Sequence, residues 1–166
     1  MARAVKDATT PGILLVDKPQ GITSHDVVQR ARRALGTRKV GHAGTLDPMA
    51  TGLLILGAEW ATRLLTFIVG LDKTYEATIR LGVTTDSDDA DGVETSRVDA
   101  AALAAIEDEQ IFAGIAALTG AISQVPPRYS AIKIEGERAY DLARDGEIVE
   151  LQARQVEIHA LTVVNT

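Results

Sequence analysis

The 166-residue sequence contains no cysteine, which excludes a disulfide scaffold and any metal site built from thiolates. This absence is compatible with a reducing compartment, and we expect the protein to be cytoplasmic. Residues 1–10 include Arg3 and Lys6 but no apolar stretch, so we expect no secretory signal there. The G-x-G-x-x-G, P-loop and H-E-x-x-H motifs are also missing. The sequence therefore gives no sign of a nucleotide cofactor or a zinc site.

The sequence also lacks an apolar run suited to crossing a membrane. The apolar stretch between Leu53 and Leu71 is interrupted by Glu59 and Arg63, so we expect a buried strand followed by a core-facing helix. The acidic run from Asp86 does not fit a calcium loop, because Ala90 falls at the fifth position and the glycine comes one residue late. We expect a solvated loop there, and neither a metal nor a membrane partner.

Charge is unevenly distributed along the chain. The net charge of −6 argues against a nucleic-acid partner, because such binding depends on cationic contacts with phosphates. However, residues 18–42 hold six lysines and arginines against one acid, whereas residues 86–109 hold nine acids against one arginine. We expect the basic part to contact a nucleic-acid backbone, with a solvated helix face as the alternative. The candidate residues are Arg30, Arg33, Arg38, Lys39 and, with less support, Lys133.

Local patterns predict the elements. Residues 13–16 read as a strand, and a helix follows with Ser24 as its N-cap, Asp26 in its first turn and Gly36 as its stop. Residues 75–81 alternate as a half-buried strand does, with Tyr75 on the core side. Residues 99–118 predict two short helices broken near Asp108 or Gly114. Strands are expected in 130–134 and 149–164, and a short helix in 139–143. Without a linker, a repeat or a βαβ rhythm, the pattern predicts one α+β domain over residues 1–166.

One loop carries most of the chemical information. Residues 41–52 read Gly-His-Ala-Gly-Thr-Leu-Asp-Pro-Met-Ala-Thr-Gly, so a single carboxylate, that of Asp47, lies among glycines and a proline. Gly41, Gly44 and Gly52 permit positive φ or a close approach, and Pro48 biases Asp47 toward extended geometry. Such a loop is suited to aiming one side chain. Any one of these residues alone would indicate only an ordinary turn.

The whole string closely resembles the catalytic motif of the bacterial tRNA pseudouridine-55 synthases. Two further segments match that family in the same order: residues 15–24, Leu-Val-Asp-Lys-Pro-Gln-Gly-Ile-Thr-Ser, and residues 129–133, Tyr-Ser-Ala-Ile-Lys, followed by Gly136, Tyr140, Ala143 and Arg144. The resemblance runs from about Ile13 to the end of the sequence. It implies the pseudouridine synthase fold, a mixed and largely antiparallel sheet flanked by helices.

The resemblance also implies an activity and a set of roles. Asp47 would be the nucleophile that isomerises a uridine in the TΨC loop of tRNA, attacking C6 of the base or C1′ of the ribose, or acting as a base at the 2′ position. No cofactor is needed. Tyr75 would stack on the flipped base and His42 would fill space in the RNA, where a core tyrosine and a surface histidine are the plainer alternatives. Lys18 would neutralise phosphate or brace the loop. The remaining substrate-binding candidates are Gly44, Thr45 and Leu46.

Partners and completeness follow from the same resemblance. We expect a monomer that acts on the tRNA stem-loop without an obligatory protein partner. The family continues beyond the position of Thr166 into a strand whose Arg pairs with the nucleophilic Asp, and then into a small RNA-binding domain. We therefore expect this chain to be the N-terminal portion of the catalytic domain, with little or no activity alone. Two alternatives stay open: a non-catalytic module that binds or folds RNA, and the catalytic subunit of a guide-RNA particle.

Overall fold

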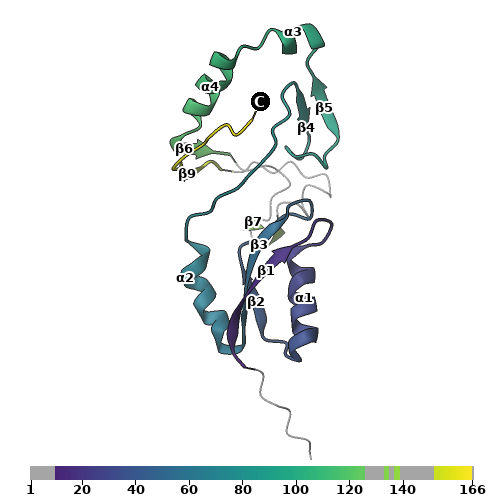
Figure 1. Ribbon diagram of the computed structural model, residues 1–166, viewed down its shortest axis with the longest axis vertical. Helices are drawn as coiled ribbons and strands as arrows, with labels where there is room; N and C mark the ends of the chain where they lie inside the picture. Colours follow the sequence, from purple (N-terminus) through teal and green to yellow (C-terminus); the bar gives the residue numbers. More distant parts are fainter. Residues whose placement is uncertain (1–9, 126–132, 135–136, 139–151, 166) are drawn as a thin grey trace, which may run out of the picture. The chain divides into compact units, whose positions relative to one another are not determined.

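The computed structural model describes residues 10–125, 133–134, 137–138 and 152–165 (Figure 1). The chain divides into two compact units, Met1–Ala77 and Thr78–Thr166. The sequence shows no linker at this boundary, so the single domain stays a prediction. Helices and antiparallel strands occur in both units, which confirms the α+β class.

The first unit is built on a three-stranded antiparallel sheet with the strand order β1-β3-β2. Its strands are β1 (Gly12–Lys18), β2 (Val40–Ala43) and β3 (Gly52–Ala58). Leu15 pairs with Ile55, and His42 pairs with Leu56. The predicted strands at residues 13–16 and 53–56 are therefore confirmed. Because β2 and β3 lie side by side, the loop between them, residues 44–51, emerges from one end of the sheet.

Helix α1 (Ser24–Leu35) begins one residue earlier than the sequence predicted, because Thr23 and not Ser24 is its N-cap. The Thr23 hydroxyl accepts the Asp26 backbone N–H at 3.0 Å, while the Asp26 carboxylate accepts the Thr23 backbone N–H at 2.9 Å. These reciprocal bonds form a capping box, and the bonds from Thr23 hold the pKa of Asp26 below its ordinary value. Gly36 ends the helix in the left-handed region, at φ 66°, where a side chain would be strained.

The core of the first unit lies between α1 and one face of the sheet. Val27 and Val28 of α1 pack with Leu54 and Leu56 of β3 and with Val40 of β2. On the opposite face, the 3₁₀ helix η1 (Glu59–Leu64) and the short helix α2 (Leu65–Val69) approach the sheet, as Figure 1 shows. The expected helix after the buried strand is thus present, as two short pieces. In the ranges given above, no helix has the length and apolar character of a membrane span.

In the residues that the structure describes, the second unit contains small antiparallel strand pairs and two helices. β4 (Val83–Thr85) pairs with β5 (Glu94–Arg97), β6 (Gly120–Gln124) with β9 (Arg154–Ile158), and β7 (Lys133–Ile134) with β8 (Glu137–Arg138). The helices are α3 (Ala100–Ala104) and α4 (Asp108–Ala117). The predicted helix break near Asp108 is confirmed. The strand expected within 149–164 is β9. Only residues 133–134 of the strand expected at 130–134 lie within the described ranges, and the helix expected at 139–143 lies outside them.

The predicted strand at residues 75–81 is wrong. The structure assigns no strand to these residues, and Tyr75 is 70% exposed rather than on a core face. Alternation favours a strand only where a second strand supplies hydrogen bonds, and no described segment pairs with residues 75–81. Sequence alternation by itself therefore did not decide the conformation here.

Candidate active site

Asp47 lies on the loop that joins β2 to β3. Gly44 and Gly52 mark the two ends of this loop and adopt φ of 97° and 111°, which confirms that both positions use glycine for its positive φ. The Asp47 carbonyl accepts the Ala50 N–H at 3.0 Å, so residues 47–50 form a tight turn with Pro48 inside it. The Asp47 side chain is exposed. A carboxylate on a closed turn at the end of a sheet is accessible to a large substrate.

The loop is held by the segment between β1 and α1. The Gly21 N–H donates to the Pro48 carbonyl at 2.8 Å, and Lys18 Nζ donates to the same oxygen at 3.3 Å. Ser24 Oγ accepts the Leu46 N–H at 2.9 Å and donates to the Leu46 carbonyl at 3.1 Å. The residues on both sides of Asp47 are therefore anchored to residues 18–24. Two segments that resemble family motifs meet at this point.

Lys18 is completely buried, with 0% of its surface exposed. Besides Pro48, its ammonium donates to the carbonyls of Ile22 at 2.8 Å and Pro19 at 3.1 Å. These three acceptors match the three N–H donors of an ammonium, so the buried charge is fully hydrogen-bonded. Of the two roles expected for Lys18, this geometry supports bracing the loop, because contact with a phosphate requires an exposed ammonium.

Ser24 is the residue whose role sequence reasoning missed. A serine at the start of a helix predicts an N-cap, and the hydroxyl was therefore assigned to its own helix. Because Thr23 supplies the cap, the Ser24 hydroxyl is directed instead to the Leu46 backbone, 22 residues away in sequence. Local sequence carries no sign of such a distant partner. Only the joint presence of the two motifs indicated that their segments belong together.

The Asp47 carboxylate itself has no hydrogen bond or ion pair to another side chain within the part of the chain that the structure describes. Its direction is therefore set by the backbone on either side of it. Leu46 contributes to this by packing its side chain against the core of the first unit. Thr45, another substrate-binding candidate, is exposed next to it.

His42 lies half-buried on β2, where its Nδ1 hydrogen-bonds to the Gly44 carbonyl. A carbonyl oxygen only accepts, so Nδ1 carries the proton in this bond. The ring consequently supports the first turn of the loop and leaves Nε2 for another partner. Gly41, one residue earlier, lies close to α2, because a Cβ at this position would meet Leu65 Cδ1 at 3.4 Å.

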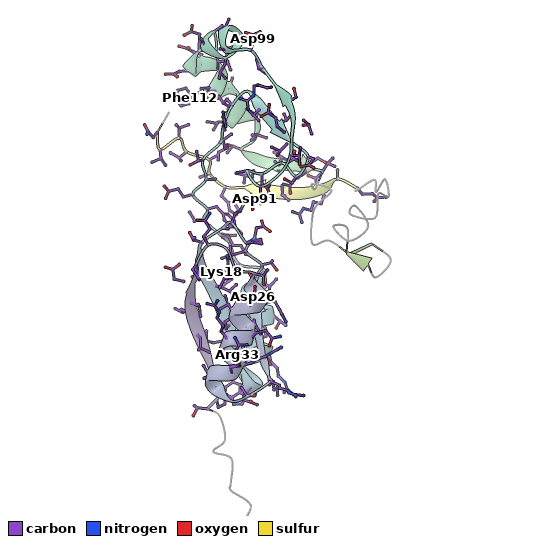
Figure 2. All side chains as sticks on the ribbon, turned by 90° about the vertical axis from the view of Figure 1, so that its right-hand side faces the viewer. Lys18, Asp26, Arg33, Asp91, Asp99 and Phe112 are labelled. Carbon is purple, nitrogen blue, oxygen red and sulfur yellow. The ribbon has the colours of Figure 1, made fainter. Side chains whose placement is uncertain are left out.

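The cationic candidates are exposed and lie away from the Asp47 loop. Arg30 and Arg33 project from the second half of α1, and Arg38 and Lys39 follow it before β2. The four residues of β2 separate Lys39 from the loop, which corresponds to about 13 Å. Figure 2 shows Lys18 and Asp26 toward one end of α1 and Arg33 toward the other. The side chain of Lys133 lies outside the described residues.

Comparisons with known proteins agree with the family that the motifs resemble. Residues 32–166 match the TruB family pseudouridylate synthase (N terminal domain). The chain is 62% identical over 152 residues to tRNA pseudouridine synthase B of Paenarthrobacter aurescens (strain TC1), covering 92% of this chain and 48% of that protein. It is 58% identical to tRNA pseudouridine synthase B of Leifsonia xyli subsp. xyli (strain CTCB07), covering 93% and 51%.

A solved structure, the "Crystal Structure of a Cbf5-Nop10-Gar1 Complex", aligns over 74% of this chain and 31% of the other, with 28% identity and a TM-score of 0.47. Residues 32–166, which are most of this chain, match the family model. The chain therefore belongs to the TruB family of pseudouridylate synthases. It spans about half the length of the curated relatives that it matches.

Proposed function

We propose that this chain forms the nucleophile-bearing part of a tRNA pseudouridine synthase, with Asp47 as the nucleophile. The observation that carries this proposal is an exposed carboxylate placed between two backbone positions, Leu46 and Pro48, that are both anchored to residues 18–24. Such anchoring suits a group that must meet a reacting atom in a defined geometry. Membership of the family and the names of its relatives support the same activity.

The reaction requires little more than a positioned nucleophile. The bond between ribose C1′ and N1 of the uracil breaks, the base turns, and C1′ is rejoined at C5. The hydrogen on C5 leaves as a proton and N1 gains one, so the product is an isomer of the substrate. Asp47 attacks C6 of the base or C1′ of the ribose, or removes the 2′ proton of the ribose, and the three routes share the need for an ionised carboxylate. No oxidant, reductant or nucleotide takes part.

The target uridine is stacked within folded RNA and must leave the stack to reach Asp47. We assign Tyr75 to stacking on the extruded base, which its 70% exposure permits. His42 is assigned to the space that the base leaves, and Gly44, Thr45 and Leu46 to the wall around the uracil. The substrate is the TΨC stem-loop of tRNA. The protein acts in the cytoplasm as a monomer without an obligatory protein partner.

The four exposed cations bind the RNA backbone at a distance from the chemistry. Lys39 lies about 13 Å from the Asp47 loop along β2, and Arg30, Arg33 and Arg38 are exposed on α1 and the turn that follows it. Phosphate contacts there position the RNA without reading its sequence. We therefore expect substitutions of these cations to change the Kd for tRNA, and substitutions in the Asp47 loop to change the rate of the reaction.

The proposal is tested by incubating the chain with a tRNA transcript that carries tritium at C5 of its uridines. Formation of the new bond at C5 expels that hydrogen, so the tritium appears in water. We expect slow release from the chain and none from Asp47→Asn. Asp17→Asn is the matched control, because Asp17 is an exposed carboxylate on β1, outside the loop, and its loss leaves the release unchanged.

The outcomes separate the three candidate functions. Release that depends on Asp47 supports the synthase. Tight binding of the tRNA without release, equal in Asp47→Asn and the unsubstituted chain, contradicts it and favours an RNA-binding module. Release that appears only after a guide RNA and small basic proteins are added favours the guide-RNA particle.

A further inference from the structure

Ser24 connects helix α1 to the loop that carries Asp47. Its side chain is 2% exposed, and with Lys18 it makes up the buried polar residues among those described. The capping box of Thr23 and Asp26 marks the start of α1 at Ser24. Val27 and Val28, one turn later, are buried in the core. The hydroxyl therefore projects from a support that has little freedom to move.

The two hydrogen bonds of this hydroxyl act on the peptide groups on both sides of Leu46. The Leu46 N–H belongs to the peptide plane shared with Thr45, and the Leu46 carbonyl to the plane shared with Asp47. Fixing the second plane fixes the position of the Asp47 Cα atom. Since no described side chain bonds to the Asp47 carboxylate, this backbone constraint has no side-chain substitute.

We propose that Ser24 is a positioning residue that holds Asp47 at its reacting distance and has no part in binding the RNA. This inference rests on the proposed function for its kinetic consequence, although the constraint on Leu46 is independent of any activity. The bonds to Pro48 from Gly21 and Lys18 hold the other side of Asp47, so loss of Ser24 frees one side of the loop and leaves the other attached. The loop then stays in place approximately and loses its exact geometry.

The decisive variants are Ser24→Ala, which removes both bonds with little change in volume, and Ser24→Thr, which retains the hydroxyl. We expect Ser24→Ala to lower the single-turnover rate of tritium release about ten- to a hundredfold, because small misplacements of a catalytic group are costly. The Kd for tRNA is expected to change less than about twofold, because the phosphate contacts lie elsewhere. Ser24→Thr restores most of the rate.

Thr23→Ala is the matched control, because it removes the N-cap of the same helix and retains the Ser24 hydroxyl. It lowers the midpoint of urea unfolding without lowering the rate of the folded fraction. A second readout is independent of catalysis: hydrogen exchange of the Leu46 amide is expected to speed up about tenfold in Ser24→Ala and to stay unchanged in Thr23→Ala.

Three results are informative. Unchanged exchange at Leu46 in Ser24→Ala would show that the bond does not constrain the loop, and it overturns the inference. Faster exchange with an unchanged rate of release also overturns it, because Asp47 then needs no such support. Absence of release from the unsubstituted chain refutes the proposed function alone, and the exchange measurement then decides whether Ser24 holds the loop.

Discussion

At the scale of single residues, the two buried polar residues that the structure describes both serve one loop. Among the described residues these are Lys18 and Ser24, and both bond to the backbone of residues 46–48. Burying a charged or polar group is costly unless its hydrogen bonds are made, and here they are made. Both buried residues therefore lie where the backbone next to the exposed Asp47 carboxylate has to be held.

Lys18→Met keeps the length of the side chain and removes its ammonium. We expect the free energy of unfolding in urea to fall by about 2–3 kcal/mol, because three carbonyl oxygens lose a charged donor. Lys39→Met, an exposed substitution of the same kind, is the control and is expected to change it by less than about 0.5 kcal/mol. Equal effects of the two variants would contradict the bracing role.

At the scale of elements, the close packing of η1 on β3 supports the strand that follows the Asp47 loop. A Cβ on Gly57 would lie 2.8 Å from the Ala61 carbonyl oxygen and 3.0 Å from Thr62 Cα. Both neighbours are backbone atoms, which cannot rotate away. The glycine is therefore required by proximity, since its φ is not among the positive ones.

Gly57→Ala is expected to destabilise the chain by about 1–3 kcal/mol, the usual effect of forcing extra volume into a packed region. Gly12→Ala is the matched control on β1, because a Cβ there meets nothing within 4 Å. Urea unfolding of the two variants measures the difference. A Gly57→Ala protein as stable as Gly12→Ala would show that η1 is free to move off the strand.

The capping box of α1 makes part of the stability depend on pH. Because the bonds from Thr23 lower the folded-state pKa of Asp26, its contribution is present above the unfolded value of about 3.9. It is lost as the pH falls through the lower folded value. We expect Asp26→Asn to be less stable than the unsubstituted chain at pH 7 and to approach it as the pH falls below the unfolded value of about 3.9 in urea titrations. A difference that stays constant over this range would contradict the assignment.

The sequence predicted the elements that local chemistry determines. Strand β1, helix α1 with its Gly36 stop, and the break before Asp108 follow from apolar spacing, capping residues and glycine. The strand expected at Tyr75 was wrong, because pairing depends on a second segment that periodicity cannot supply. For the same reason the sequence located the Asp47 loop but not the Ser24 bond that holds it.

At the scale of the whole molecule, opposite charges are separated along the chain. Four exposed cations, Arg30, Arg33, Arg38 and Lys39, lie on α1 and the turn after it, whereas the acidic run from residue 86 to 109 belongs to the second unit. The first unit therefore has a basic surface that suits a polyanion, although the net charge of the chain is −6. Affinity for RNA is expected to come from this surface and to weaken with salt.

Replacing Arg30 and Arg33 together by glutamine tests this separation. Log K for tRNA binding falls linearly with log salt concentration, and we expect the slope of this line to become less negative by about one to two, because two phosphate contacts are lost. The single-turnover rate at saturating tRNA is expected to stay the same. Arg97→Gln, in the acidic region, is the control and should leave the slope unchanged. If Arg97→Gln changed the slope as much as the double substitution, the affinity would depend on the net charge of the chain and not on this surface.

The measurement that tests the central claim most directly is to map where pseudouridine forms in an unmodified tRNA transcript after incubation with the chain. Carbodiimide labelling followed by primer extension reports each modified uridine as a stop. The account predicts one stop, in the TΨC loop, that is absent with Asp47→Asn. The same stop with both proteins would contradict the assignment of Asp47 as the nucleophile, and no stop from a chain that binds the transcript would contradict the proposal that this chain catalyses the reaction.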